Sequence, residues 1–138
     1  MDLVLPMPVP QAGVIPYRRE QHDLDVLLIT SRRRGRWIIP KGWVDRRLDP
    51  ARSALQEAYE EAGVRGMLSR AALGWYQYRK QHMRRTVVVF ALEVQVVLER
   101  WPEMDERERR WFPLSVAAEL VRGSELRRLI ATLPQRTQ

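Results

Sequence analysis

The chain has 138 residues, 45% hydrophobic and 30% charged, which fits one compact domain over residues 1–138 and excludes two domains of ordinary size. It has no cysteine, which excludes disulfides and thiolate metal ligands, and no apolar run near the ~20 residues that cross a bilayer. The net charge of +7, carried mostly by arginine, predicts anionic partners. With no secretory leader visible, we expect a cytoplasmic location and no membrane partner.

The first half of the chain predicts strands followed by a helix. Residues 11–19 and 25–31 are predicted strands joined by a polar turn, and residues 37–39 form a short apolar segment that ends at Pro40. Asp49 followed by Pro50 is a strong helix start, and Gly63 is a natural helix end. We therefore predict a helix of about three and a half turns between them.

The second half predicts a hairpin and a helical end. Residues 73–79 and 86–98 are rich in β-branched and aromatic residues and flank a basic connection. Residues 109–112 predict a short strand, and residues 113–133 predict helices interrupted near Gly123. Strands before, around and after the central helix predict an α/β fold, with a mixed sheet covered by helices. We also expect the apolar, proline-rich N-terminus to cover a sheet edge of its own or of a neighbouring chain.

The predicted helix has two different faces. At about 100° per residue, one side carries six residues that we expect to pack on the sheet: Ala51, Ala54, Leu55, Ala58, Tyr59 and Ala62. Glu57, Glu60 and Glu61 form a second cluster at i, i+3 and i+4, where like charges repel. Either the cluster is a solvated acidic face, or Mg²⁺ or Mn²⁺ binds among the three carboxylates. The spacing does not decide between these interpretations.

The surrounding stretch, PKGWVDRRLDPARSALQEAYEEAGV at residues 40–64, resembles the signature box of the Nudix hydrolases. The positions that match the box are Gly42, Glu57, Ala58, Glu60, Glu61, Gly63 and Val64. This resemblance implies a Nudix-type α/β/α sandwich with the box helix packed on a mixed sheet. It also implies catalysis with Mg²⁺ or Mn²⁺ held by Glu57, Glu60, Glu61 and the Gly42 carbonyl.

Two positions depart from the box. Leu48 stands where the family has its first Glu, and Gln56 stands where it has Arg. In the family these two residues are generally paired and connect the loop to the helix. Because both are replaced, we interpret the change as a neutral pair in place of an ionic one, with the metal ligands retained.

Outside the box, residues 11–115 resemble the branch that includes the diphosphoinositol polyphosphate phosphohydrolases, and diadenosine polyphosphates fit the arginine set equally well. The resemblance rests on Ser31-Arg32, Arg36-Trp37, RKQHMRRTVVVFALEV, Trp101 and ERERRWFPL. The residues that it assigns to a phosphate site are Arg18, Ser31, Arg32, Arg36, Lys41, Arg85 and Arg107. For each of these residues, the alternative interpretation is an ordinary surface side chain with no phosphate contact. The five tryptophans are interpreted as packing residues rather than a base-stacking surface, although Trp37, Trp43 and Trp75 are placed to border a pocket.

The predicted activity is metal-dependent hydrolysis of a diphosphate linkage in a polyphosphorylated small molecule, of the diphosphoinositol polyphosphate or dinucleoside polyphosphate type. Glu60 or Glu61 is the predicted general base, with Glu106 and Glu108 in reserve. One alternative is an RNA 5′-pyrophosphohydrolase. Another is a catalytically weakened module that binds nucleotide or RNA, which Leu48 and Gln56 would favour. Nucleic acid is thus a possible but not favoured partner, and we expect a monomer or homodimer.

Overall fold

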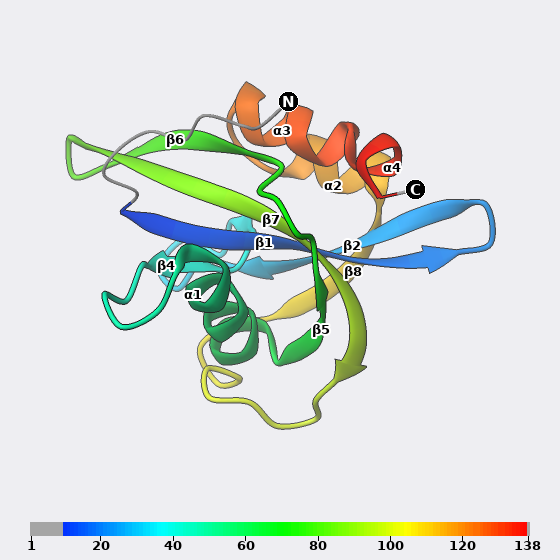
Figure 1. Ribbon diagram of the computed structural model, residues 1–138, viewed down its shortest axis with the longest axis horizontal. Coiled ribbons are helices and arrows are strands. Elements are labelled where there is room, and N and C mark those ends of the chain that lie inside the picture. The colour runs from blue at the N-terminus through cyan, green and yellow to red at the C-terminus, as the bar shows by residue number, and fades with distance from the viewer. Residues whose placement is uncertain (1–9, 138) are drawn as a thin grey trace.

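The computed structural model describes residues 10–137, so the N-terminal segment expected to cover a sheet edge lies outside the described residues. Figure 1 shows helices on both sides of one twisted sheet. Within the described range the strands of this sheet are β1 (Gln11–Glu20), β2 (Asp23–Thr30), β3 (Trp37–Ile38), β4 (Lys41–Trp43), β5 (Val64–Leu68), β6 (Gly74–Lys80), β7 (Met83–Val97) and β8 (Arg109–Pro113). The helices are α1 (Pro50–Glu57), its continuation η1 (Ala58–Ala62), α2 (Leu114–Leu120), α3 (Ser124–Ala131) and α4 (Leu133–Arg136).

The sheet is mixed, as predicted. Its main path runs β3-β2-β1-β7-β5, with β4 paired to β1, β6 to β7 and β8 to β2. The central pair, β1 and β7, is parallel, and the other pairs are antiparallel. Helix α1 lies on one side of the sheet and α2 to α4 lie on the other (Figure 1). The predicted α/β/α arrangement is therefore confirmed.

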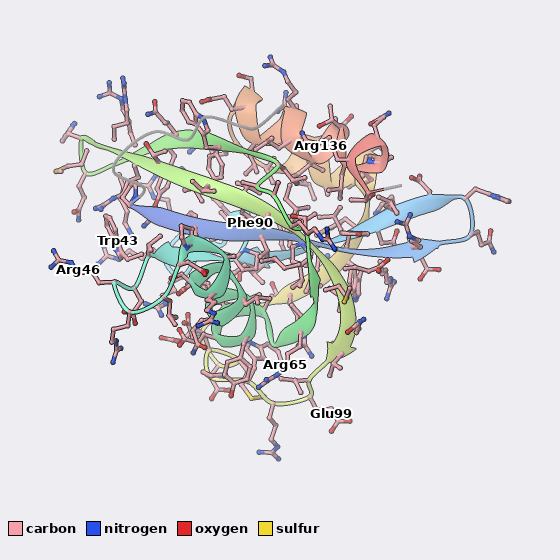
Figure 2. The ribbon with its side chains drawn as sticks, viewed as in Figure 1. Trp43, Arg46, Arg65, Phe90, Glu99 and Arg136 are labelled. Carbon is pink, nitrogen blue, oxygen red and sulfur yellow. The ribbon has the colours of Figure 1, made fainter. Side chains whose placement is uncertain are left out.

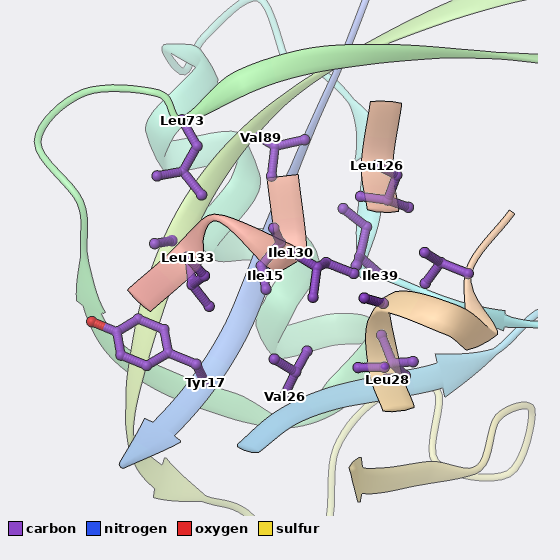
Figure 3. Close-up of a cluster of buried hydrophobic side chains, with 14 of the residues drawn as sticks. Ile15, Tyr17, Val26, Leu28, Ile39, Leu73, Val89, Leu126, Ile130 and Leu133 are labelled. Carbon is purple, nitrogen blue, oxygen red and sulfur yellow. The ribbon is translucent and has the colours of Figure 1, made fainter. Parts of the chain in front are cut away.

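Each face of the sheet has its own apolar core. On one face, Ile15 and Leu28 from the central strands pack with Ile130 and Leu133 from the terminal helices (Figure 3). On the other face, small residues of the helix that carries the glutamates pack against the strands: Ala54, Ala58 and Ala62 are all fully buried. Alanines bring the helix backbone close to the sheet, which places the neighbouring glutamates near the strand backbone.

The helix between Asp49 and Gly63 forms as predicted at both ends. The Asp49 side chain accepts a hydrogen bond from the backbone N–H of Arg52 at 2.8 Å, and Gly63 has φ +66°. Two details differ from prediction. The last turn, Ala58–Ala62, is a π-helix, a form that is frequent at functional sites. Leu55, which we expected on the buried side, is 36% exposed.

Two strands were missed by the sequence patterns. Neither segment was predicted as a strand, but Lys41–Trp43 pairs with β1 as β4 and Val64–Leu68 pairs with β7 as β5. Both are short and contain glycine, so their strand structure comes from the partner and not from local propensity. The connection predicted at residues 80–85 is also shorter, because Gln81 and His82 alone form the turn, both with positive φ. No helix within residues 10–137 is long and apolar enough to span a membrane.

Candidate functional site

Gly42 lies directly against the carboxylate of Glu57. A Cβ atom at Gly42 would lie 2.3 Å from the carboxyl carbon and from both oxygens of Glu57. The register of β1 and β4 places Gly42 opposite Ala12, on the face of the sheet where the helix that carries Glu57 packs. The missing side chain therefore creates the space in which the Glu57 carboxylate lies, and this explains why glycine is needed here.

We expect Gly42→Ala to reduce activity more than stability. The Cβ would meet the movable end of one side chain, so Glu57 would rotate away while the backbone stays in place. A catalytic carboxylate displaced by about 1 Å costs on the order of 10²-fold in rate. The measurement is Mg²⁺-dependent hydrolysis beside urea unfolding. As a contrast, Gly13→Ala meets the carbonyl oxygen of Pro40 at 2.6 Å and should lower stability by ~1–3 kcal/mol. Equal stability losses in the two variants would contradict this prediction.

Glu61 is buried, with 7% of its surface exposed, and both of its oxygens have partners. One oxygen accepts the backbone N–H of Lys41 at 3.0 Å. The other accepts Nη2 of Arg107 at 3.1 Å. Arg107 also donates to Glu103 at 2.9 Å and to the carbonyl of Thr30 at 3.1 Å, so this guanidinium links the helix to β2 and to the loop before β8.

Glu60 borders a cleft that contains both departures from the sequence box. The cleft has a volume of about 170 Å³ and is lined by Trp43, Asp45, Leu48, Ser53, Gln56, Glu57 and Glu60. The Gln56 amide donates a hydrogen bond to Glu60 at 2.7 Å, and Leu48 is half-buried at the cleft wall. The two replaced positions therefore line the same cleft, and Gln56 bonds to a carboxylate of its own helix.

Burial and repulsion from neighbouring carboxylates make Glu57 and Glu61 harder to ionise. Burial raises the pKa of Glu57 to about 7, and the charges of Glu61, Glu60 and Glu103 add to this effect. Burial also raises the pKa of Glu61 to about 7, although Arg107 and the Lys41 N–H act in the opposite direction. A cation bound among these groups would remove both costs.

The donor chemistry of the site fits a hard divalent cation, because the cleft is lined by the carboxylates of Glu57 and Glu60, and Glu61 follows directly in the helix. The arrangement is not already that of a metal shell: within residues 10–137, no three acidic or histidine side chains form a metal-ligating group. The cause is visible in the contacts. Arg107 occupies one oxygen of Glu61, and Gln56 occupies one oxygen of Glu60. Both oxygens of Glu61 thus have partners, because the other accepts the Lys41 N–H, whereas the second oxygen of Glu60 has no protein partner within residues 10–137.

The raised pKa of Glu57 predicts a pH-dependent stability in the metal-free protein. Because the folded state holds this proton more tightly than the unfolded chain does, the contribution to stability is complete below about pH 4.5 and is lost as the pH rises through about 7. Glu57→Gln cannot ionise, so its stability relative to wild type should increase between pH 5 and pH 8. Urea unfolding in EDTA measures this difference. An identical difference at both pH values would contradict the prediction, and saturating Mg²⁺ should abolish the wild-type loss.

The loop between β7 and β8 contributes residues that the sequence patterns missed. It satisfies two of the last carbonyls of η1: the backbone N–H of Glu103 donates to the carbonyl of Glu60, and Trp101 Nε1 donates to that of Glu61. Arg109 Nη1, from the start of β8, donates to the carbonyl of Ala62. Glu103 is also a fourth carboxylate at the site. The sequence feature that could have indicated Glu103 is its spacing of four residues from Arg107. The two residues named as further candidates for the general base are placed differently: Glu108 is exposed, and Glu106 contacts Arg32 at 3.6 Å.

The predicted phosphate-site residues fall into separate groups. Arg32 and Arg107 both bond to Glu103, and the Ser31 hydroxyl accepts the backbone N–H of Arg36. The Lys41 ammonium lies 4.6 Å from the ring centre of Tyr78, and the Arg85 guanidinium lies 4.6 Å from that of Trp43. Arg18 stands apart, near the other end of β1 and paired with Glu20 and Asp25. The assignment of this set to phosphate binding stays a prediction.

Comparison with known proteins places these features in context. A family model described as the NUDIX domain matches residues 7–133. The chain is 39% identical to Nudix hydrolase 21, chloroplastic, of Arabidopsis thaliana, over 83% of this chain and 61% of that protein. It is 35% identical to diphosphoinositol polyphosphate phosphohydrolase 3-alpha of Mus musculus, over 80% of this chain and 68% of that protein. The chain thus spans about two-thirds or less of the length of these relatives.

The fold also matches solved structures. The crystal structure of the C. elegans Ap4A hydrolase superposes with a TM-score of 0.78, covering 96% of this chain and 100% of that one. The two sequences are 20% identical, so this likeness concerns the fold alone.

Proposed function

Because the chain belongs to the Nudix family, we propose that it is a metal-dependent hydrolase that cleaves a diphosphate linkage in a polyphosphorylated small molecule. The observation that carries this proposal is the position of Glu57, which lies against Gly42 and, with Glu60, lines the cleft. Carboxylates whose ionisation is costly in the metal-free protein become favourable ligands beside a cation.

Glu57, Glu60 and Glu61 would hold the Mg²⁺ or Mn²⁺, with the carbonyl of Gly42. A bound divalent ion polarises a phosphoryl oxygen and lowers the pKa of a bound water. The chain's own residues position these ligands. The Lys41 N–H and Arg107 orient the Glu61 side chain, and the loop before β8 holds the end of the helix. Glu60, which is half-buried and lines the cleft, would accept the proton from the attacking water.

Cations near this site would hold the substrate phosphates, and the net charge of +7 favours approach of an anion. Arg36, Lys41 and Arg85 are the proposed phosphate ligands that have no carboxylate partner within residues 10–137. The names of the mouse and nematode proteins point to diphosphoinositol polyphosphates and to Ap4A, and both classes are within the proposal. The proposal also includes a single domain over residues 1–138, a cytoplasmic location and a monomeric or homodimeric state. The plant relative is instead named as chloroplastic.

The test is a substrate panel in Mg²⁺ and in Mn²⁺, scored by phosphate-containing products. It includes Ap4A, a diphosphoinositol polyphosphate and a 5′-triphosphorylated RNA. We expect metal-dependent hydrolysis of at least one of the small molecules and none in EDTA. Faster cleavage of the RNA, with a steep salt dependence and competition by long RNA, would instead support an RNA 5′-pyrophosphohydrolase.

A binding module without catalysis is a second candidate, because Arg107 and Gln56 occupy the carboxylates that a metal would need. The same panel separates it from the enzyme. Binding of these compounds with no product in either metal would favour the module and contradict the hydrolase.

A further inference from the structure

The helix that carries the glutamates ends against the segment 98–109, which runs from the loop after β7 into β8 (Figure 1). A helix leaves its last carbonyls without hydrogen-bond partners inside the helix. Here each of the four carbonyls at residues 60–63 accepts a hydrogen bond from this segment. The donors are backbone or side-chain groups of Leu98, Trp101, Glu103 and Arg109. One short segment therefore fixes where the backbone of the last turn lies.

Arg109 places a positive charge at this end of the helix. Its Nη1 atom donates to the carbonyl of Ala62 at 2.9 Å and to that of Gly63 at 3.3 Å, and it has no carboxylate partner within residues 10–137. The helix dipole is negative at its C-terminal end, where it favours a cation and disfavours a carboxylate. Glu60 and Glu61 lie in this last turn, so the charge of Arg109 offsets an unfavourable feature of their position.

Trp101 holds the Arg109 guanidinium in place. The guanidinium carbon lies 3.7 Å from the centre of the half-buried indole ring, a stacked arrangement that leaves the N–H groups free to donate in the guanidinium plane. The indole also donates through Nε1 to the carbonyl of Glu61 at 3.1 Å. Trp101 is thus a packing residue, as the sequence indicated, whereas that interpretation is wrong for Trp43, which is 57% exposed.

Gly63 provides the space for this pair. A Cβ atom at Gly63 would lie 2.7 Å from Nη1 of Arg109 and 2.7 Å from two ring atoms of Trp101. Its φ of +66° is also one that other residues rarely adopt. Both the space and the backbone conformation therefore require glycine, and the helix end and the stacked pair form one unit.

The contacts of this unit reach the two glutamates through their backbone. The carbonyl of Glu61 is held by Trp101, while the Glu60 side chain accepts only the Gln56 amide within residues 10–137. The turn Ala58–Ala62 is a π-helix, a rare form, and the external donors supply partners for its carbonyls. A divalent cation such as Mg²⁺ accepts only a narrow range of ligand distances, so a shift of this turn would weaken its binding.

We propose that Trp101 and Arg109 are positioning residues for the metal ion, because they fix the turn from which Glu60 and Glu61 project. This inference rests on the proposed function for the identity of the metal ligands. It goes beyond that function in making the affinity for a divalent cation depend on two side chains outside the ligand set.

Binding of Mn²⁺ in the absence of substrate, measured by calorimetry and by the electron paramagnetic resonance signal of the free ion, tests the proposal. Trp101→Phe keeps a ring to stack on Arg109 but removes the donor to the Glu61 carbonyl. This variant should bind Mn²⁺ about tenfold more weakly than wild type, as loss of a residue that orients a metal ligand does. Arg109→Gln should weaken binding by about 10- to 100-fold, and Arg109→Lys, which restores the charge but not the planar group, should recover only part of this loss.

Ile130→Val is the control for a general loss of stability. Ile130 is fully buried in the core on the other face of the sheet, so deleting one methyl group lowers the urea midpoint without touching the helix end. Its Mn²⁺ affinity should stay within about twofold of wild type. Equal weakening of Mn²⁺ binding in Ile130→Val and Trp101→Phe would show general loosening and overturn the proposal.

Two further outcomes separate this inference from the proposed function. Wild-type Mn²⁺ affinity in both Trp101→Phe and Arg109→Gln would overturn the inference, and metal-dependent hydrolysis by wild type would then leave the proposed function intact. No Mn²⁺ binding by wild type would overturn the inference together with the metal-dependent function on which it rests.

Discussion

Glu60→Gln is expected to lower turnover in saturating Mg²⁺ by about 10²-fold or more, as loss of a general base or of a key metal ligand does. The amide has almost the same shape as the carboxylate and cannot accept the proton. Glu60 is only partly buried and lies on the cleft, so the free energy of unfolding should change little. Initial rates on the best substrate of the panel, with urea unfolding of the same sample, measure both effects.

Glu99→Gln is the matched control for that variant. Glu99 is exposed in the loop after β7, at the bottom of the view in Figure 2, and does not line the cleft, so its replacement should leave turnover within about twofold. Near-normal turnover of Glu60→Gln would refute the assignment of Glu60. If Glu57→Gln then lost activity, the role would pass to that carboxylate and the helix would remain the reacting element. A loss in Glu103→Gln would instead place the role on the loop before β8.

Arg107→Met is expected to destabilise the fold by ~3–5 kcal/mol, because it leaves buried charge without its partner. The Arg107 and Glu61 side chains are 8% and 9% exposed, and Arg107 bonds to Glu61, Glu103 and the Thr30 carbonyl together. Methionine fills a similar length without supplying a charge. Urea unfolding at pH 8, where the carboxylates ionise most fully, gives the free energy.

Removing both members of the ion pair distinguishes a charge effect from a packing effect. Arg107→Met combined with Glu61→Gln should recover part of the loss, since the stranded carboxylate is gone. Additive losses in the double variant would show that Arg107 acts through packing instead. Arg32→Met is the control at an exposed position. The Arg32 side chain bonds to the same Glu103 but is 55% exposed, so this variant should lose less than about 1 kcal/mol of unfolding free energy.

The helix with the glutamates was predictable because its signals are local. Asp49 and Pro50 start it, Gly63 ends it, and alanines at helical spacing lie on the sheet side. Its resemblance to the Nudix box predicted the family, which the match over residues 7–133 confirms. Strands β1, β2, β6, β7 and β8 were also predicted, since their β-branched and aromatic runs bury side chains in either face of the sheet.

The partners of the arginines were not predictable, because they depend on residues far away in the chain. Arg18 and Arg107 look alike in the sequence, yet Arg18 pairs with neighbours near the β1–β2 turn and Arg107 lies buried against Glu61, 46 residues earlier. The path of the loop before β8, which lies against the end of η1, decides this difference. The register of β1 and β4 makes a strand of Lys41–Trp43, a segment too short to specify its own conformation.

Local patterns thus account for the α/β class, the ends of the carboxylate helix and the spacing of Glu57, Glu60 and Glu61. These features depend on caps and on side-chain period, which act over a few residues. The tertiary structure alone decided that Arg107 is the cation that bonds to Glu61. It also decided that Arg85 stacks on Trp43, which lies 42 residues earlier in the chain. Such contacts join segments that are far apart in the chain, because the packing of the strands, the helix and the loop before β8 brings them together.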